Sequence, residues 1–209
     1  MFNFYERKVL PKLCNYCCGS KPIEKQRKKV VPHAKGVVLE IGMGTGLNLP
    51  YYDKNNITNI IGLDPSKESN KFAKELADKN NIDIEFLQSG AEEINLPDQS
   101  IDTILITYTL CTIPELRPSL DEIKRVMRKD GKVLFLEHGK SPDKRVRKFQ
   151  NFLNPVWGKV FGGCNLNRDI PSLLIESGLK INKLNEMYIP KTPKFIGYNF
   201  WGEASNDNW

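Results

Sequence analysis

Residues 37–52 read VVLEIGMGTGLNLPYY, a short run of β-forming residues followed at once by three glycines at every second position. Such a glycine loop is typical of an open α/β sheet, in which ligands bind beyond the carboxyl ends of the strands. Glycine permits positive φ and lets ligand atoms come close to the backbone. We therefore predict a ligand-binding loop at Gly42, Gly44 and Gly46.

The spacing of these glycines separates two classes of nucleotide ligand. The dinucleotide fingerprint GxGxxG, started at Gly42 or Gly44, needs glycine at position 47 or 49, and both positions are leucine. The sequence instead has ExGxGxG, with Glu40 just ahead of the loop. A carboxylate suits a ligand with an ammonium group better than one with a pyrophosphate. This pattern favours S-adenosylmethionine (SAM) over NAD.

Two further positions fit a nucleoside ligand. Asp64, in GLDPS, ends the next β-type run and lies 18 residues after Gly46, where a carboxylate can accept hydrogen bonds from both ribose hydroxyls. Its alternative role is to cap the following helix, which Ser66 can do instead. Ala91 and Glu92 follow the third β-type run, where a small residue lets an adenine ring lie against the backbone.

Strand-like and helix-like segments alternate through most of the chain, which predicts a parallel sheet covered on both faces. The expected strands after the glycine loop are Asn59–Asp64, Ile84–Gln88, Ile101–Leu110 and Lys132–Glu137, with a final hairpin of Lys180–Ile189 and Phe195–Trp201. The expected helices are Lys67–Lys79, Pro118–Arg128, about 143–153 and Pro171–Ser177, besides an amphipathic helix within 2–18.

The positive charge is confined to the amino-terminal segment. The 209 residues carry a formal charge of +6, of which residues 1–36 contribute nine Lys or Arg and two Glu. We therefore divide the chain into a basic amphipathic arm, 1–35, and a domain, 36–209. Three roles are open to the arm: a solvated linker, contact with an anionic membrane surface, and contact with nucleic acid. Nucleic acid is disfavoured, because the only further basic patch is 144–148.

The termini and the cysteines bear on location and metals. No run is long enough to span a membrane, and the start of the chain lacks the apolar core of a signal peptide, so we expect a cytoplasmic protein, with peripheral membrane contact as the alternative. Five cysteines fit a reducing compartment. The cluster CxxCC at 14–18 has no second half-site, so we expect no metal.

Several motifs together resemble a known family. VLEIGMGTG, GLDPS, SGAEEINLPDQSID, TYTLCTIPE and GKVLFLEHG resemble the class I SAM-dependent methyltransferases of the methyltransferase domain 11 type. LCTIP, FLEHG, NPVW and GGCNLNRDI further resemble the methyltransferase-like seven family, the thiol S-methyltransferases, and their bacterial relatives. The resemblance covers residues from about 30 to Trp201. It implies a Rossmann-like, seven-stranded, mostly parallel sheet with a reversed last strand, helices on both faces, and SAM as methyl donor.

The resemblance also assigns roles by position. The cofactor-binding set that it implies is Glu40, Gly42, Gly44, Gly46 and Asn48 at the methionine end, Asp64 and Pro65 at the ribose, Ala91 and Glu92 at adenine, and Thr107 beneath the cofactor.

Candidates for catalysis lie beyond the fourth and fifth expected strands. His138 is the best candidate for a general base, and its alternative is a bond to a nearby carbonyl. Cys111, Asn165 and Arg168 are candidates for substrate binding; Cys111 could equally be a packing residue and Arg168 a partner of a local acid. The leading hypothesis is methyl transfer to a small molecule, with a thiol as the family-based acceptor. Three alternatives stay open: a lipid or quinone acceptor, a non-catalytic SAM-binding module, and an NAD-dependent oxidoreductase, which the glycine spacing disfavours.

Overall fold

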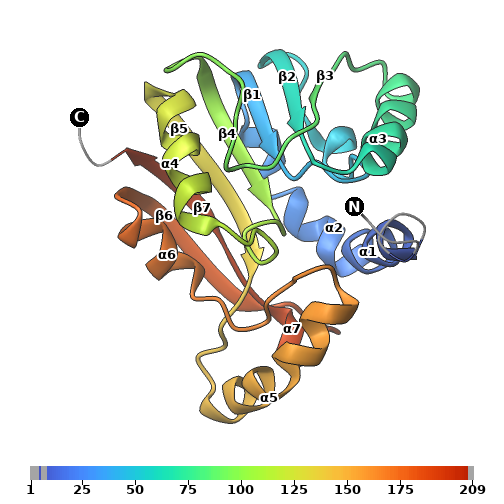
Figure 1. Ribbon diagram of the computed structural model, residues 1–209, viewed down its shortest axis with the longest axis vertical. Helices are drawn as coiled ribbons and strands as arrows, with labels where there is room; N and C mark the ends of the chain where they lie inside the picture. Colours follow the sequence, from blue (N-terminus) through green and yellow to red (C-terminus); the bar gives the residue numbers. More distant parts are fainter. Residues whose placement is uncertain (1–4, 6–8, 207–209) are drawn as a thin grey trace.

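The computed structural model describes Tyr5 and residues 9–206, and its centre is one seven-stranded sheet (Figure 1). The strands run in the order β3-β2-β1-β4-β5-β7-β6. Their bounds are β1 Gly36–Ile41, β2 Ile57–Leu63, β3 Glu85–Leu87, β4 Ile101–Thr107, β5 Met127–His138, β6 Leu179–Tyr188 and β7 Tyr198–Asn206.

All neighbouring pairs from β3 to β5 are parallel, whereas β7 is antiparallel to both β5 and β6. The last strand is thus reversed, which confirms the expected class I methyltransferase-like architecture. The predicted terminal hairpin is also confirmed. Its second strand starts at Tyr198, a few residues later than expected, because Lys194–Gly197 form the one-turn helix α7.

Helices flank the sheet and its carboxyl edge. They are α1 Leu10–Cys18, α2 Lys21–Arg27, α3 Lys67–Lys79, α4 Leu116–Val126, α5 Lys144–Val160, α6 Ile170–Glu176 and α7, with 3-10 turns η2 Val31–His33 and η3 Leu49–Tyr51. Side chains of Ser66, Asp143 and Asp169 cap α3, α5 and α6 by accepting a backbone N–H in the first turn. The prediction for α5 was too short: the helix continues through Pro155 to Val160, because a proline costs one intrahelical bond without always ending the helix. The predicted helix within 2–18 is α1 from residue 10; residues 1–4 and 6–8 lie outside the described residues.

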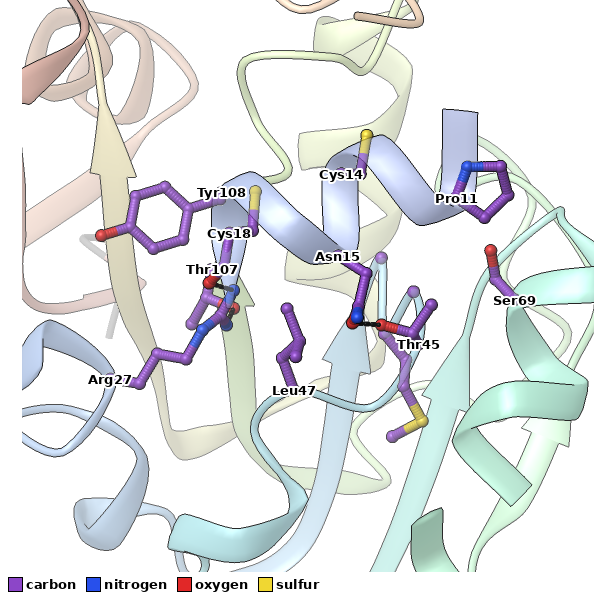
Figure 2. A pocket seen from close by; sticks show the side chains of 13 residues that line it. Pro11, Cys14, Asn15, Cys18, Arg27, Thr45, Leu47, Ser69, Thr107 and Tyr108 are labelled. Atoms are coloured by element: carbon purple, nitrogen blue, oxygen red, sulfur yellow. Dashed lines mark hydrogen bonds between the residues drawn. The ribbon is translucent and has the colours of Figure 1, made fainter. Parts of the chain in front are cut away.

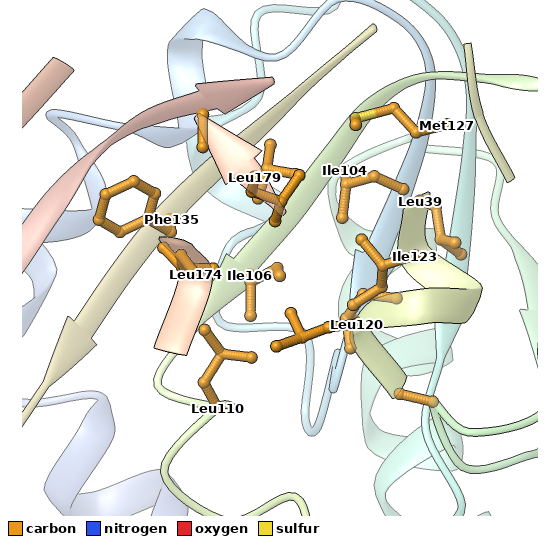
Figure 3. Packing of buried hydrophobic residues seen from close by; sticks show 14 of the residues in the cluster. Leu39, Ile104, Ile106, Leu110, Leu120, Ile123, Met127, Phe135, Leu174 and Leu179 are labelled. Atoms are coloured by element: carbon orange, nitrogen blue, oxygen red, sulfur yellow. The ribbon is translucent and has the colours of Figure 1, made fainter. Parts of the chain in front are cut away.

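Alternate strand residues pack into two apolar layers, as expected for a sheet covered on both faces. On one face, residues such as Leu39, Ile104 and Phe135 contact α4 and α6 (Figure 3). On the other face, Val38, Ile60 and Leu134 lie against α3 and the segment around η2. These two layers fix the central strands and therefore the loops that follow them.

The strand order reverses between β1 and β4, because β2 follows β1 on one side and β4 pairs with its other side. In open α/β sheets this is the point at which the loops diverge and a ligand can enter. Figure 1 shows α1 and α2 beside this edge, and α5 set apart from the sheet below β5. None of the described helices is long and apolar enough to cross a membrane.

Gly202 in β7 gives a test of the hairpin. A Cβ at this position would come within 1.8 Å of the carbonyl oxygen of Lys183, where the register of β6 shifts. We expect Gly202→Ala to lower the free energy of unfolding by about 1–3 kcal/mol, because a strand must move to admit the methyl group. Urea unfolding measures this. Gly158→Ala in α5 is the matched control, because its added methyl would meet no atom closer than 3.7 Å; equal losses would contradict the strand-crowding argument.

Candidate functional site

A partly open cavity lies at the carboxyl ends of β1 and β4, between the sheet and α1 (Figure 2). It holds about 510 Å³ of empty space, part of it open to solvent, which is within the range of small-molecule sites. Side chains from α1 and α2, the glycine loop, α3 and the end of β4 line it: Pro11, Cys14, Asn15, Cys18, Arg27, Gly42, Met43, Gly44, Thr45, Leu47, Ser69, Thr107 and Tyr108.

The glycine loop takes a conformation that other residues adopt rarely. Gly42, Gly44 and Gly46 have φ of 66°, 57° and 81°. A Cβ on Gly42 would lie 2.3 Å from the side chain of Thr109, whereas a Cβ on Gly44 would have only the carbonyl oxygen of Gly42 within 4 Å. The loop is therefore packed against β4 at Gly42 and open at Gly44, where a ligand can approach the backbone.

Asp64 ties the glycine loop to the next strand. One carboxylate oxygen accepts from the backbone N–H of Gly44 at 2.9 Å, and the other accepts from that of Ser66 at 2.8 Å. Burial raises the pKa of Asp64, against these two hydrogen bonds, which lower it. Ser66 itself caps α3, as the sequence allowed. The ribose role of Asp64 stays a prediction, and its lone pairs beyond these two bonds are available for it.

Glu40 lies behind the wall of the cavity in a buried polar network. Its two carboxylate oxygens accept from the Asn48 side chain at 2.9 Å and the Tyr52 hydroxyl at 2.6 Å. Asn48 also donates to the Thr107 hydroxyl at 2.9 Å. Among these, Thr107 lines the cavity. The network holds Asn48 and Thr107 in place, and a direct contact between Glu40 and a cofactor stays a prediction.

Arg27 completes this network and is the residue that the sequence reasoning missed. It comes from the arm, yet it is only 5% exposed. Its guanidinium donates to the Asn48 side chain at 2.7 Å and to the Thr107 hydroxyl at 2.8 Å, and its Nε is buried with no hydrogen-bond partner among the described residues. No sequence signal singles it out, because it is one of several basic residues in a basic segment.

The Glu40 network predicts a pH dependence of stability. Burial raises the pKa of Glu40 from 4.5 to about 7, although bonds from Tyr52 and Asn48 and the charge of Arg27 lower it; Asp64 raises it further. The pKa in the folded protein exceeds that of the unfolded chain. The contribution of protonated Glu40 to the free energy of unfolding is therefore full below about pH 4.5 and is lost as the pH rises through about 7. The loss is on the order of 3 kcal/mol.

Glu40→Gln tests this dependence, because glutamine keeps an acceptor oxygen but does not titrate. We expect the free energy of unfolding of the wild type to fall more between pH 5 and pH 8 than that of the variant, measured by urea titration. Parallel pH profiles for the two proteins would contradict it.

The remaining residues of the predicted cofactor set lie apart from the cavity wall. Pro65 and Glu92 are exposed beyond β2 and β3, and Ala91 is buried in the apolar layer that contains Leu39. They flank the edge at which an adenine was predicted. Their contact with a cofactor stays a prediction.

A second buried group follows β4 and β5. The carboxylate of Glu137 accepts the backbone N–H groups of Thr109 and Leu110 at 2.6 and 2.9 Å, both at the same oxygen, Oε1. This contact fixes the turn that presents Cys111. Next to it, Nε2 of His138 lies 3.2 Å from the sulfur of Cys164.

Cys111, His138 and Cys164 thus meet although they come from three segments far apart in the sequence. All three are buried, and their candidate ligand atoms lie within 4.8 Å of one another. A hydrogen bond from Cys111 and the proximity of His138 lower the pKa of Cys164, against burial. Burial opposes charge on His138, but the Cys164 sulfur outweighs it, so the pKa of His138 is raised.

Asn165 and Arg168 hold the loops around this group. The Arg168 guanidinium donates to the carbonyl oxygens of Leu110 and Ile113. The Asn165 side chain donates to the carbonyl of Cys111 at 3.0 Å and to that of Gly163 at 2.8 Å. Lys140, not Arg168, pairs with Asp169. Substrate contact by Asn165 and Arg168 stays a prediction, because these bonds brace backbone.

Comparisons with known proteins agree with this fold. The family model described as "Methyltransferase domain" matches residues 39–135. Human thiol S-methyltransferase TMT1A is 29% identical over 177 residues, which are 83% of this chain and 72% of that protein. Phosphatidylethanolamine N-methyltransferase of Cereibacter sphaeroides is 32% identical over 145 residues, which are 64% of this chain and 70% of that protein.

The fold also matches solved structures. A SAM-dependent methyltransferase from Leishmania major superposes with a TM-score of 0.70 at 16% identity, over 95% of this chain and 79% of the other. Across the two relatives above and two further thiol S-methyltransferases, of rat and human, this chain spans 55% to 72% of the relatives' own lengths.

Proposed function

The chain belongs to the class I SAM-dependent methyltransferases, and from this premise we propose that it methylates the sulfur of a small-molecule thiol. The observation that carries the thiol is the buried group of Cys111, His138 and Cys164 near the carboxyl ends of β4 and β5, in which Cys111 follows Tyr108 of the cavity wall by three residues. The thiol S-methyltransferases among the relatives support the same acceptor.

The cavity fits SAM in charge and shape. SAM carries a carboxylate at its methionine end, and Arg27 offers a buried guanidinium with one N–H unpartnered among the described residues. Charge-assisted bonds of this kind are among the stronger ones in proteins. The open side of Gly44 gives the backbone approach that the cofactor needs, and Asp64 lies behind it for the ribose.

When bound, SAM supplies an electrophilic methyl group on its sulfonium. The chain supplies position: Arg27 and the glycine loop hold one end of the donor, and Asp64 holds the ribose. An in-line displacement gains much of its rate from such positioning. Without a metal in this group, His138 is our candidate for taking a proton from the acceptor; its ring lies at the end of β5, with Nε2 3.2 Å from the Cys164 sulfur and the ring centre 6.4 Å from that of Tyr108.

Calorimetric titration with S-adenosylhomocysteine, with NADH in parallel, tests the cofactor. We expect micromolar binding of S-adenosylhomocysteine and none of NADH. An acceptor screen of thiols, amines and hydroxyl compounds with labelled SAM then tests the acceptor. Turnover of thiols above the other classes supports the proposal, whereas methylation of amines or hydroxyls alone, or cofactor binding without turnover of any class, rejects it.

Arg27→Met tests the carboxylate contact separately from the rest of the cofactor. We expect it to weaken S-adenosylhomocysteine binding by about tenfold or more, the value of one charge-assisted hydrogen bond. Binding of 5′-methylthioadenosine, which lacks the carboxylate, is expected to change little. Equal losses for the two ligands would show that Arg27 acts on the fold of the cavity instead of the carboxylate.

A second candidate is an acceptor carried by a membrane, and one surface favours it. Four apolar side chains of α5, Phe149, Phe152, Val156 and Val160, recur at helical spacing and are 41% to 80% exposed. Exposed Lys144, Arg145, Lys148 and Lys159 lie on the same helix. A basic helix with an exposed apolar stripe suits the surface of an anionic bilayer. The arm is adjacent, since the Tyr5 hydroxyl donates to the carbonyl of Val160.

Vesicle sedimentation tests this surface. We expect salt-sensitive binding to vesicles that contain anionic lipid, and its loss in Phe152→Ser/Val156→Ser. Ile175→Ser is the matched control, because Ile175 is as exposed but lies on α6. Absence of binding by the wild type, or an equal loss in the control, rejects a membrane-borne acceptor presented at α5.

A further inference from the structure

The group of Cys111, His138 and Cys164 has the donor set of a soft-metal site. Two thiol sulfurs and one imidazole nitrogen lie within 4.8 Å of one another, with Nε2 and the Cys164 sulfur 3.2 Å apart. Thiolate and imidazole together favour zinc over magnesium or calcium, which prefer oxygen ligands. Two cysteines and a histidine are also a known set for zinc with one open position.

Hydrogen bonds hold each of the three ligand-bearing segments in place. Cys111 follows the turn fixed by Glu137, and its carbonyl oxygen accepts the backbone N–H of Asn165 at 2.8 Å. His138 is the last residue of β5, paired with Asn199 of β7. Cys164 donates its N–H to the carbonyl of Phe161. Donors fixed by separate contacts lose little entropy on binding an ion.

Buried polar atoms without a partner among the described residues gather at the same place. Nδ1 of His138 and Oε2 of Glu137 are two of them; Nδ1 belongs to the ring whose Nε2 lies 3.2 Å from the Cys164 sulfur, and Glu137 precedes His138 in β5. Buried polar groups in folded proteins are nearly always satisfied, so such a concentration points to a group that binds there. From the sequence we expected no metal, because the cluster at 14–18 has no second half-site; Cys111, His138 and Cys164 are spaced by 27 and 26 positions and form no local metal-binding motif.

We propose that Cys111, His138 and Cys164 bind one zinc ion, and that its fourth coordination position takes the sulfur of the acceptor. The acceptor part rests on the proposed thiol methylation; the zinc site does not. The site lies near the cofactor cavity, because Cys14, which lines the cavity, is close enough to Cys164 to interact with it electrostatically. Cys18, which lines the cavity, lies close enough to Cys164 to interact with it electrostatically.

The chemistry balances without a further reactant. His138 as a zinc ligand would no longer serve as the base, so an acceptor thiol that binds zinc would release its proton to solvent and keep a lone pair on a zinc-bound thiolate at neutral pH. That lone pair forms the new carbon–sulfur bond as the bond from the methyl carbon to the SAM sulfonium breaks. The products are a methyl thioether and S-adenosylhomocysteine. A thioether is a weaker zinc ligand than a thiolate, so the product leaves.

Metal analysis of the full chain tests the site. After chelator treatment and reconstitution with zinc, we expect about one ion per chain, falling below about one tenth in Cys111→Ser, Cys164→Ser and His138→Ala. Cys17→Ser is the matched control and is expected to keep the full content, because Cys17 lies outside the group. S-adenosylhomocysteine binding shows that each variant is folded. Full zinc content in the three folded variants, or no zinc in the wild type, overturns the site.

Cobalt(II) in place of zinc tests the open position. We expect a tetrahedral absorption spectrum that changes when a model thiol is added. A spectrum that no thiol changes, together with loss of the metal in Cys18→Ser, would show a closed site with Cys18 as fourth ligand and overturn the acceptor part. Two results distinguish the failure of the zinc proposal from the failure of the proposed function. Undiminished thiol methylation by the metal-free protein overturns only the part that zinc is proposed to take in the reaction. A zinc-loaded protein that methylates no thiol overturns the proposed function and leaves the zinc site standing.

Discussion

Asp64→Ala is expected to weaken S-adenosylhomocysteine binding by about 100-fold. The variant loses the carboxylate predicted to accept the two ribose hydroxyls. Each hydrogen bond to a charged group contributes about 1.5–3 kcal/mol. The substitution also removes the acceptor of the backbone N–H of Gly44, which lies 2.9 Å from the Asp64 carboxylate. The glycine loop thereby loses its hydrogen bond to the residue that follows β2. Calorimetric titration measures the change.

Asp53→Ala is the matched control for this variant. Asp53 also accepts two hydrogen bonds within its own loop, from Asn55 and Asn56, but neither involves the glycine loop. We expect its affinity to stay within about twofold of the wild type. A folded Asp64→Ala protein that binds S-adenosylhomocysteine as tightly as the control would remove Asp64 from the cofactor site.

Glu137→Ala is expected to lower the free energy of unfolding by about 3 kcal/mol, or the melting temperature by about 10 °C. The reason is local: two buried backbone N–H groups, of Thr109 and Leu110, lose their common acceptor. The turn after β4 would then loosen and displace Cys111. Thermal unfolding followed by circular dichroism measures the first effect.

Glu137→Gln separates the acceptor from the charge. Glutamine also lacks the negative charge, but its single oxygen can accept both N–H groups, because both bonds in the wild type go to Oε1. We expect it to stay within about 1 kcal/mol of the wild type. If glutamine destabilises the protein as much as alanine, the charge of Glu137, and not its role as acceptor, supports the turn.

The fold was predictable because its signals are local. The alternation of strands and helices and the glycine loop follow from short sequence patterns, and the reversed last strand followed from the family resemblance. The errors were at ends: α5 continues past its expected end near residue 153 and through Pro155, and β7 starts after a helical turn. Helix and strand ends depend on which neighbours complete the hydrogen bonds, and periodicity does not record this.

Part of the cavity wall was among the residues named from the sequence. Gly42, Gly44 and Thr107 line the cavity, and their contact with a cofactor stays a prediction. Arg27 was missed because a basic residue in a basic segment gives no sign of burial; only the tertiary contact with Asn48 and Thr107 distinguishes it. The meeting of Cys111 with Cys164 is equally invisible in the sequence, since the turn held by Glu137 and the loop after α5 create it together.

The position of α1 has a kinetic consequence. This helix covers the cavity beside the glycine loop, and Thr45 donates to the Asn15 side chain across the gap at 2.8 Å (Figure 2). S-adenosylhomocysteine can leave on this side only after α1 has moved away from the glycine loop. We therefore expect slow departure of S-adenosylhomocysteine, strong product inhibition and a burst in the first turnover. A fusion partner that pins the amino terminus would then lower the steady-state rate and leave the burst unchanged.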